Sequence, residues 1–92
     1  MARFLVIHHP QYPKADSLDP FIYAARNLMA SLGPDLRWLN SWWAANRELL
    51  FCEWEAPSEE ALRATLQEAC TLWPIDVVYE VFWNDPHWYL DN

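Results

Sequence analysis

At 92 residues and 10.9 kDa, the chain has room for one small domain with a single modest core, which excludes a multidomain enzyme. Its 53% of hydrophobic residues excludes a disordered chain, and its single glycine excludes the glycine-rich loops that bind dinucleotides or nucleoside triphosphates. A formal net charge of −7 repels polyanions, so nucleic acid is not an expected partner.

No stretch of the sequence approaches the about 20 apolar residues of a membrane span, so no membrane association is expected. The apolar run from Phe4 to Ile7 is also too short for the core of a secretory signal peptide. We therefore expect a cytoplasmic protein. In that compartment Cys52 and Cys70 are expected to be reduced and largely buried rather than joined in a disulfide.

The first half of the chain predicts a strand, a helix and a second strand. Residues 3–9 (RFLVIHH) are rich in β-branched, aromatic and long apolar side chains and end before a proline, which is typical of a strand. Asp19 as N-cap and Pro20 as the first helical residue indicate a helix start, and an apolar stripe at helical spacing then runs to a Gly-Pro pair. The aromatic-rich residues 36–44 (LRWLNSWWA) predict the second strand.

The second half repeats this order as strand, helix and strand. Residues 48–56 (ELLFCEWEA) alternate with a period of two. This places Leu50, Cys52 and Trp54 on one face and Leu49, Phe51, Glu53 and Glu55 on the other. Ser58 is a good N-cap, and the helical spacing that follows predicts a helix up to Trp73. Residues 77–83 (VVYEVFW) predict the fourth strand, and a polar and aromatic tail follows.

The predicted order β-α-β-β-α-β is that of an α+β ferredoxin-like fold, with residues 1–92 forming one domain. Two helices then cover one face of a four-stranded antiparallel sheet, and the other face, with Phe51 and its neighbours, is left uncovered. An apolar face of that size indicates association, so we expect a homodimer that pairs these faces around a barrel-like space.

Several segments resemble one known family: LGPDLRWL at residues 32–39, Phe51-Cys52, and APSEE at residues 56–60. From about Leu28 to Pro86, the chain resembles small bacterial nickel-binding proteins with a ferredoxin-like fold. The resemblance implies a homodimeric α+β barrel and, for part of the family, binding of Ni²⁺. Two histidines of that family are replaced here, by Asn40 and within residues 63–65.

His9, Glu53 and Glu80 are the candidate metal ligands. If His9 lies on the same sheet face as Leu5 and Ile7, its imidazole could meet the two carboxylates, and such a set suits Ni²⁺ or Zn²⁺. The alternative interpretation is structural: the histidine is hydrogen-bonded at a strand end, and the glutamates form ion pairs with arginines such as Arg3.

The seven tryptophans are more than a core of this size can bury beneath two helices. Some of them must line a dimer interface or a pocket, and Asn40, Trp42 and Tyr79 are the candidate pocket residues for a planar apolar ligand. Packing between two copies is the alternative explanation for the same side chains.

Three functions follow from these patterns. The first is a homodimeric, non-enzymatic binding protein for a transition metal, with Ni²⁺ or Zn²⁺ as candidates. The second is an aromatic-lined dimeric barrel that binds a small molecule or resembles a cofactor-independent oxygenase. The third is an assembly domain whose tail around His87, Trp88 and Tyr89 docks on another copy or protein. No spacing of nucleophile, acid and base indicates catalytic residues, which favours a binding role over an enzyme.

Overall fold

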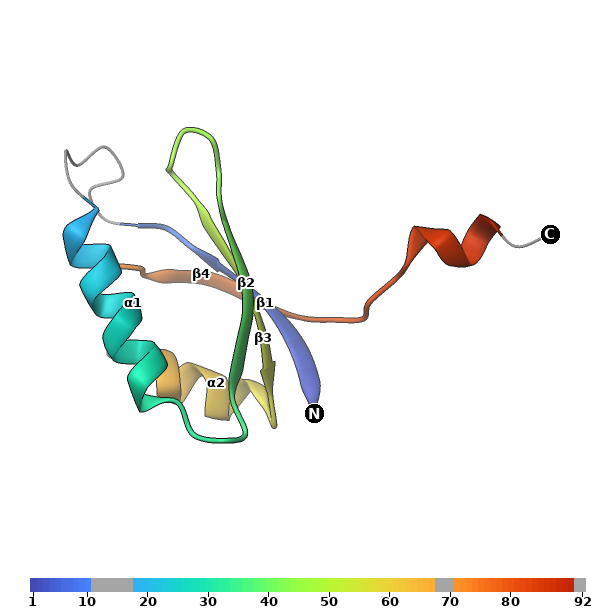
Figure 1. Ribbon diagram of the computed structural model, residues 1–92, viewed down its shortest axis with the longest axis horizontal. Coiled ribbons are helices and arrows are strands. Elements are labelled where there is room, and N and C mark those ends of the chain that lie inside the picture. Colours follow the sequence, from blue (N-terminus) through green and yellow to red (C-terminus); the bar gives the residue numbers. More distant parts are fainter. Residues whose placement is uncertain (11–17, 68–70, 91–92) are drawn as a thin grey trace.

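Four strands and two α-helices alternate along the chain in the computed structural model, which describes residues 1–10, 18–67 and 71–90. The strands pair antiparallel in the spatial order β2-β3-β1-β4, and α1 and α2 lie on the same side of the sheet (Figure 1). This is the predicted ferredoxin-like arrangement. Its elements are β1 (Ala2–His8), α1 (Asp19–Ser31), β2 (Arg37–Trp43), β3 (Leu50–Ala56), α2 (Glu59–Leu66), β4 (Ile75–Val81) and the short 3₁₀ helix η2 (Pro86–Leu90).

The two central strands alternate between buried and partly exposed side chains, as a period of two requires. On the face beneath the helices, which we call the helix face, β3 buries Leu50, Cys52, Trp54 and Ala56, in agreement with the predicted alternation. The opposite side, which we call the open face, is covered by neither α1 nor α2 (Figure 1). Strand register assigns to the open face Arg3, Leu5, Ile7, Arg37, Asn40, Trp42, Phe51, Glu53, Glu55, Val77, Tyr79 and Val81.

The helix starts differ in how they are capped. Ser58 is the N-cap of α2, as predicted, and its Oγ accepts a hydrogen bond of 3.1 Å from the Ala61 N–H. The prediction that Asp19 caps α1 is wrong, because Leu18 is the N-cap and Asp19 is already in the first turn. There its carboxylate is still favourably placed for the positive end of the helix dipole.

Two boundaries depart from the periodicity of the sequence. The second helix ends at Leu66 rather than continuing to Trp73, which is nevertheless buried in the core. The apolar residues after Leu66 keep a helix-like spacing because Trp73 packs into the same core as the buried residues of α2. The fourth strand spans Ile75–Val81, two residues earlier than predicted, because its register on β1 begins with Ile75 opposite His8.

Each edge strand carries one extra residue relative to its neighbour. The register between β2 and β3 shifts between Trp38 and Asn40, which leaves Leu39 without an opposite residue. The register between β1 and β4 shifts in the same way at Asp76. These bulges decide where the side chains that follow them point.

The core lies between the helix face and the two helices. Trp54 is 1% exposed and stacks on Trp38, while Phe21 of α1 stacks on Trp73 with ring centroids 5.9 Å apart. Cys52 is buried, as expected, whereas Cys70 lies outside the described residues. None of the helices described is long and apolar enough to cross a bilayer.

Candidate functional site

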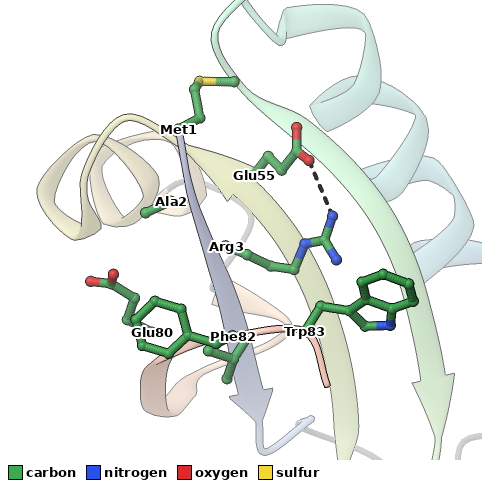
Figure 2. Close-up of a pocket in the computed structure, with 8 residues that line it drawn as sticks. Met1, Ala2, Arg3, Glu55, Glu80, Phe82 and Trp83 are labelled. Carbon is green, nitrogen blue, oxygen red and sulfur yellow. Dashed lines mark hydrogen bonds and ion pairs between the residues drawn. The ribbon is translucent and has the colours of Figure 1, made fainter. Parts of the chain in front are cut away.

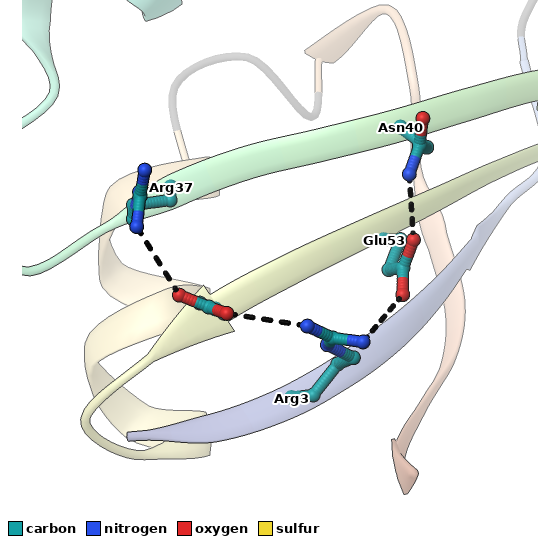
Figure 3. Close-up of polar contacts among 5 residues, drawn as sticks. Arg3, Arg37, Asn40 and Glu53 are labelled. Carbon is teal, nitrogen blue, oxygen red and sulfur yellow. Dashed lines mark hydrogen bonds and ion pairs between the residues drawn. The ribbon is translucent and has the colours of Figure 1, made fainter. Parts of the chain in front are cut away.

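The open face carries a chain of alternating charges across three strands (Figure 3). The Arg3 guanidinium lies 3.5 Å from a carboxylate oxygen of Glu53 and 3.3 Å from one of Glu55. Glu55 also lies 3.9 Å from Arg37, and Asn40 Nδ2 donates to Glu53 at 2.8 Å. The two arginines neutralise the two glutamates, so this part of the face has no net charge.

The structure does not bring His9, Glu53 and Glu80 together within one chain. Glu53 pairs with Leu5 on the open face, whereas Glu80 pairs with Phe4 and therefore belongs to the helix-face side of the edge strand β4. Figure 2 shows Glu80 pointing away from the Arg3 side chain and its Glu55 partner. Their role as ligands stays a prediction, and Glu53 takes the ion-paired arrangement that was the alternative.

His9 instead meets a carboxylate that the sequence did not single out. Its Nδ1 lies 3.1 Å from Oδ2 of Asp76, and both side chains are exposed. The bulge at the start of β4 explains this contact, because it turns Asp76 out of the regular pairing toward the end of β1. No sequence periodicity signals a bulge, so Asp76 was missed.

All three histidines engage an oxygen through Nδ1. His87 Nδ1 lies 2.9 Å from Asp85 Oδ1, and His8 Nδ1 lies 2.9 Å from the Trp73 carbonyl oxygen. Because these oxygens only accept, Nδ1 carries the proton in each neutral imidazole, and Nε2 holds the lone pair that can bind a metal. A carboxylate behind a histidine in this way also orients it as a metal ligand.

The exposed and buried histidines differ in their surroundings. His8 is only 2% exposed, and burial lowers its pKa below the usual 6.5, although the Trp73 carbonyl and the charge of Asp76 act in the opposite direction. His9 and His87, in contrast, lie at the surface. Among the residues that the structure describes, no three side chains of His, Cys, Asp or Glu gather into a group that could hold a metal ion.

The candidate pocket residues share the open face but not one pocket. Asn40 and Trp42 lie on β2 at one edge, and Tyr79 lies on β4 at the other, with two strands between them. At about 4.8 Å per strand, the three steps from β2 to β4 amount to about 14 Å. Their joint role in binding a ligand therefore stays a prediction that needs more than one chain.

Hollows among the described residues contain at most one of these three candidates. A shallow one of about 210 Å³ follows the β2 bulge and is lined by Trp38, Leu39, Asn40 and Ser41. The larger, of about 490 Å³, lies where β1 begins and β4 ends (Figure 2). It is lined by Met1, Ala2, Arg3, Glu55, Glu80, Val81, Phe82 and Trp83.

Comparison with known proteins agrees with this fold. A family described as "Nickel responsive protein SCO4226-like" matches residues 4–81, which is most of the chain. The chain belongs to this family. The crystal structure of SCO4226 from Streptomyces coelicolor A3(2) is similar with a TM-score of 0.70 and 20% identity, covering 91% of this chain and 100% of that one. At that identity the likeness shows the fold alone, and no curated protein matches.

The matched range divides the candidate residues into two groups. His9, Asp76 and every open-face residue except Arg3 lie inside the SCO4226-like region. The segment that follows β4, with Trp83, His87 and Trp88, lies beyond it. The resemblance to a small nickel-related family is thus confirmed for the ferredoxin-like domain.

Proposed function

We propose that the protein is a small homodimeric binding protein, not an enzyme, that holds a transition metal such as Ni²⁺, with Zn²⁺ as the alternative ion. The observation that carries this proposal is the match of residues 4–81 to a family described as nickel responsive. Imidazole nitrogen is a favourable ligand for both ions. The domain offers such a nitrogen in His9, whose other ring nitrogen contacts Asp76.

His9 is the ligand that the geometry supports best. Its Nδ1 is held by Asp76 at 3.1 Å, which leaves the lone pair of Nε2 as the one available to a metal ion. Glu53 is a weaker candidate because Arg3 and Asn40 already occupy its oxygens. One chain therefore supplies an oriented imidazole with a supporting carboxylate, and water or a second copy completes the coordination.

An exposed site of this kind suits reversible binding better than catalysis. Catalytic metals typically lie in shaped cavities that also bury the substrate beside the ion. The imidazole of His9 is 65% exposed, so an ion there exchanges readily with solvent. A buffer or sensor of metal concentration needs that exchange.

The test is calorimetric titration of Ni²⁺ and Zn²⁺ into tag-free, chelator-treated protein at about pH 7.5. We expect binding by the natural chain and its loss in His9→Ala. His87→Ala is the matched control, because His87 has the same imidazole–carboxylate arrangement outside the family region, and it should leave the His9 site intact.

Two results would contradict the proposal in different ways. If the natural chain binds neither ion, the metal-binding function is wrong. If His9→Ala binds normally while Glu53→Ala/Glu80→Ala does not, the metal is held by the glutamates and the assignment to His9 is wrong.

A further inference from the structure

The segment after β4 is exposed although it is rich in aromatic residues. We call residues 82–90 the arm. Its Phe82, Trp83, Trp88 and Tyr89 are 89%, 63%, 56% and 75% exposed, and η2 contains no buried residue. Figure 1 shows the arm leaving the sheet on the side opposite the two helices. The radius of gyration is accordingly 14.6 Å, against about 12 Å for a compact chain of this length.

The arm has its own internal structure. Trp83 and Trp88 contact edge to face with centroids 5.1 Å apart, and the Tyr89 hydroxyl donates to Asn84 Oδ1 at 2.8 Å. Asp85 accepts from the backbone N–H groups of His87, through Oδ1, and of Trp88, through its carbonyl oxygen. A segment held in one conformation by such contacts loses little entropy when it docks, which is the property of a binding element rather than of a frayed end.

The open face of the same chain is a surface of matching chemistry. Trp42 and Tyr79 are 52% and 53% exposed there, and the charges among them are already neutralised by the pairs of Arg3 and Arg37. Covering this face therefore does not bury an unpaired charge. Trp83, at the start of the arm, lines the larger hollow with Arg3 and Glu55 of its own chain. The rest of the arm runs away from its own open face in the observed arrangement (Figure 1).

We propose that the arm docks on the open face of a second copy of this chain, and that the two copies exchange arms about a two-fold axis. A copy that turns its open face toward the first necessarily meets the arm, because the arm projects from that side. The six exposed aromatic side chains of arm and face offer roughly 600–1,000 Å² per copy, and a stable interface needs about 800 Å² per partner.

The exchange extends the proposed homodimer, because it assigns the contacts that hold the two copies together. The arm itself lies outside the region shared with the family, which ends at residue 81. Reciprocal contact also limits assembly to two copies, since each arm and each face is then used once.

Analytical ultracentrifugation of full-length variants tests the exchange. We expect a dimer for the natural chain, and Trp88→Ser and Tyr89→Ser should each raise the dimer dissociation constant at least about 30-fold, as loss of a buried aromatic anchor does. Tyr23→Ser is the matched control, because Tyr23 of α1 is 70% exposed but lies on neither arm nor open face, and it should leave the constant unchanged.

A mixing experiment distinguishes exchange from other uses of the same residues. Trp88→Ser retains an intact face, and Trp42→Lys retains an intact arm but has a damaged face. Each should be monomeric alone at a concentration where their mixture forms a one-to-one complex, because one arm and one face remain compatible. Both side chains are exposed in the single chain, so an unchanged circular dichroism spectrum and a cooperative thermal transition should confirm that the variants fold. Their melting temperature should fall only by the stabilisation that the dimer supplied.

The possible failures are separable. A dimer that persists unchanged in both arm variants overturns the exchange but keeps a homodimer. A natural chain that sediments as a monomer overturns the exchange and the homodimer together, whereas the calorimetric metal titration still decides metal binding. Variants that are monomeric alone but form no mixed complex show that the arm and the open face are not each other's partners.

Discussion

Trp38 and Trp54 lie directly opposite each other on β2 and β3, with ring planes 8° apart and centroids separated by 5.4 Å. Trp38 Nε1 donates to Ser41 Oγ at 2.7 Å, and that hydroxyl donates to Cys52 Sγ at 3.0 Å. The outer indole is therefore fixed by hydrogen bonds while the inner one fills the core. This stack ties the edge strand to the centre of the sheet.

Truncation of the inner indole should be severely destabilising. Trp54→Ala is expected to lower the free energy of unfolding by about 3–5 kcal/mol, because it opens a cavity and removes the stacking partner of Trp38. Urea denaturation measures the change. Ile22→Ala, which shortens an exposed side chain of α1, is the control and should change stability by less than about 1 kcal/mol. Equal effects would show that Trp54 is not a core residue.

The indole nitrogen of Trp54 makes a second prediction. Nε1 is buried and has no hydrogen-bond partner among the residues that the structure describes, and an unsatisfied buried donor is costly. Trp54→Phe should therefore cost clearly less than the lost side-chain volume alone implies, because the substitution also removes that donor. If Trp54→Phe is as destabilising as Trp54→Ala, the nitrogen has a partner such as a buried water.

The buried imidazole of His8 should make folding sensitive to pH. Burial lowers its pKa in the folded protein below the 6.5 of the unfolded chain, so the unfolded state binds a proton more readily. The contribution is fully present above 6.5 and is lost as the pH falls from there toward the lowered pKa. Urea midpoints measured between about pH 8 and about pH 5 should decrease, and His8→Asn should flatten the decrease. If the urea midpoint instead rises on acidification, the pKa of His8 is raised by folding and not lowered.

Removal of Arg3 should unbalance the open face. Arg3→Met is expected to lower the free energy of unfolding by about 1 kcal/mol, because Glu53 and Glu55 lose a shared cation on a partly buried surface. The loss should shrink at high salt. Arg63→Met, which breaks the exposed helical pair with Glu59, is the control and should cost at most about 0.5 kcal/mol.

The cap of α2 should be worth more than a hydroxyl elsewhere on a helix. Ser58→Ala is expected to lower the melting temperature, at a cost of about 1 kcal/mol, because the Ala61 N–H loses its acceptor. Ser31→Ala is the control, because the Ser31 hydroxyl lies at the C-terminal end of α1 and only donates to the Leu28 carbonyl oxygen. It should lower the melting temperature less than Ser58→Ala does. A similar loss in both variants would contradict the assigned role of Ser58.

The sequence predicts this fold well because its strongest patterns are local. The alternation around Cys52 and Trp54 and the cap at Ser58 each identify their element without tertiary information. The end of α2 is not predictable in the same way. A buried position such as that of Trp73 requires an apolar residue whether or not its backbone is helical.

The candidate site was less predictable because it depends on strand register. A bulge at Asp76 brings that carboxylate to His9 and determines the face of the residues that follow, including Glu80. A single-residue shift exchanges the two faces of a strand, and no periodicity in residues 75–81 reveals it. The ion pair of Glu53 was easier to predict, because a carboxylate on a sheet face pairs with any arginine that lies nearby on the same face, as Arg3 does.

The extra residues Leu39 and Asp76 have one more consequence. Both lie in the outermost strands, whose unpaired backbone groups would otherwise act as a template for further chains. A bulge interrupts the regular spacing of those groups, and Arg37 and Asp76 add charge along the same margins. Fibril growth by strand addition is thereby disfavoured at both margins, which matters for a sequence with seven tryptophans.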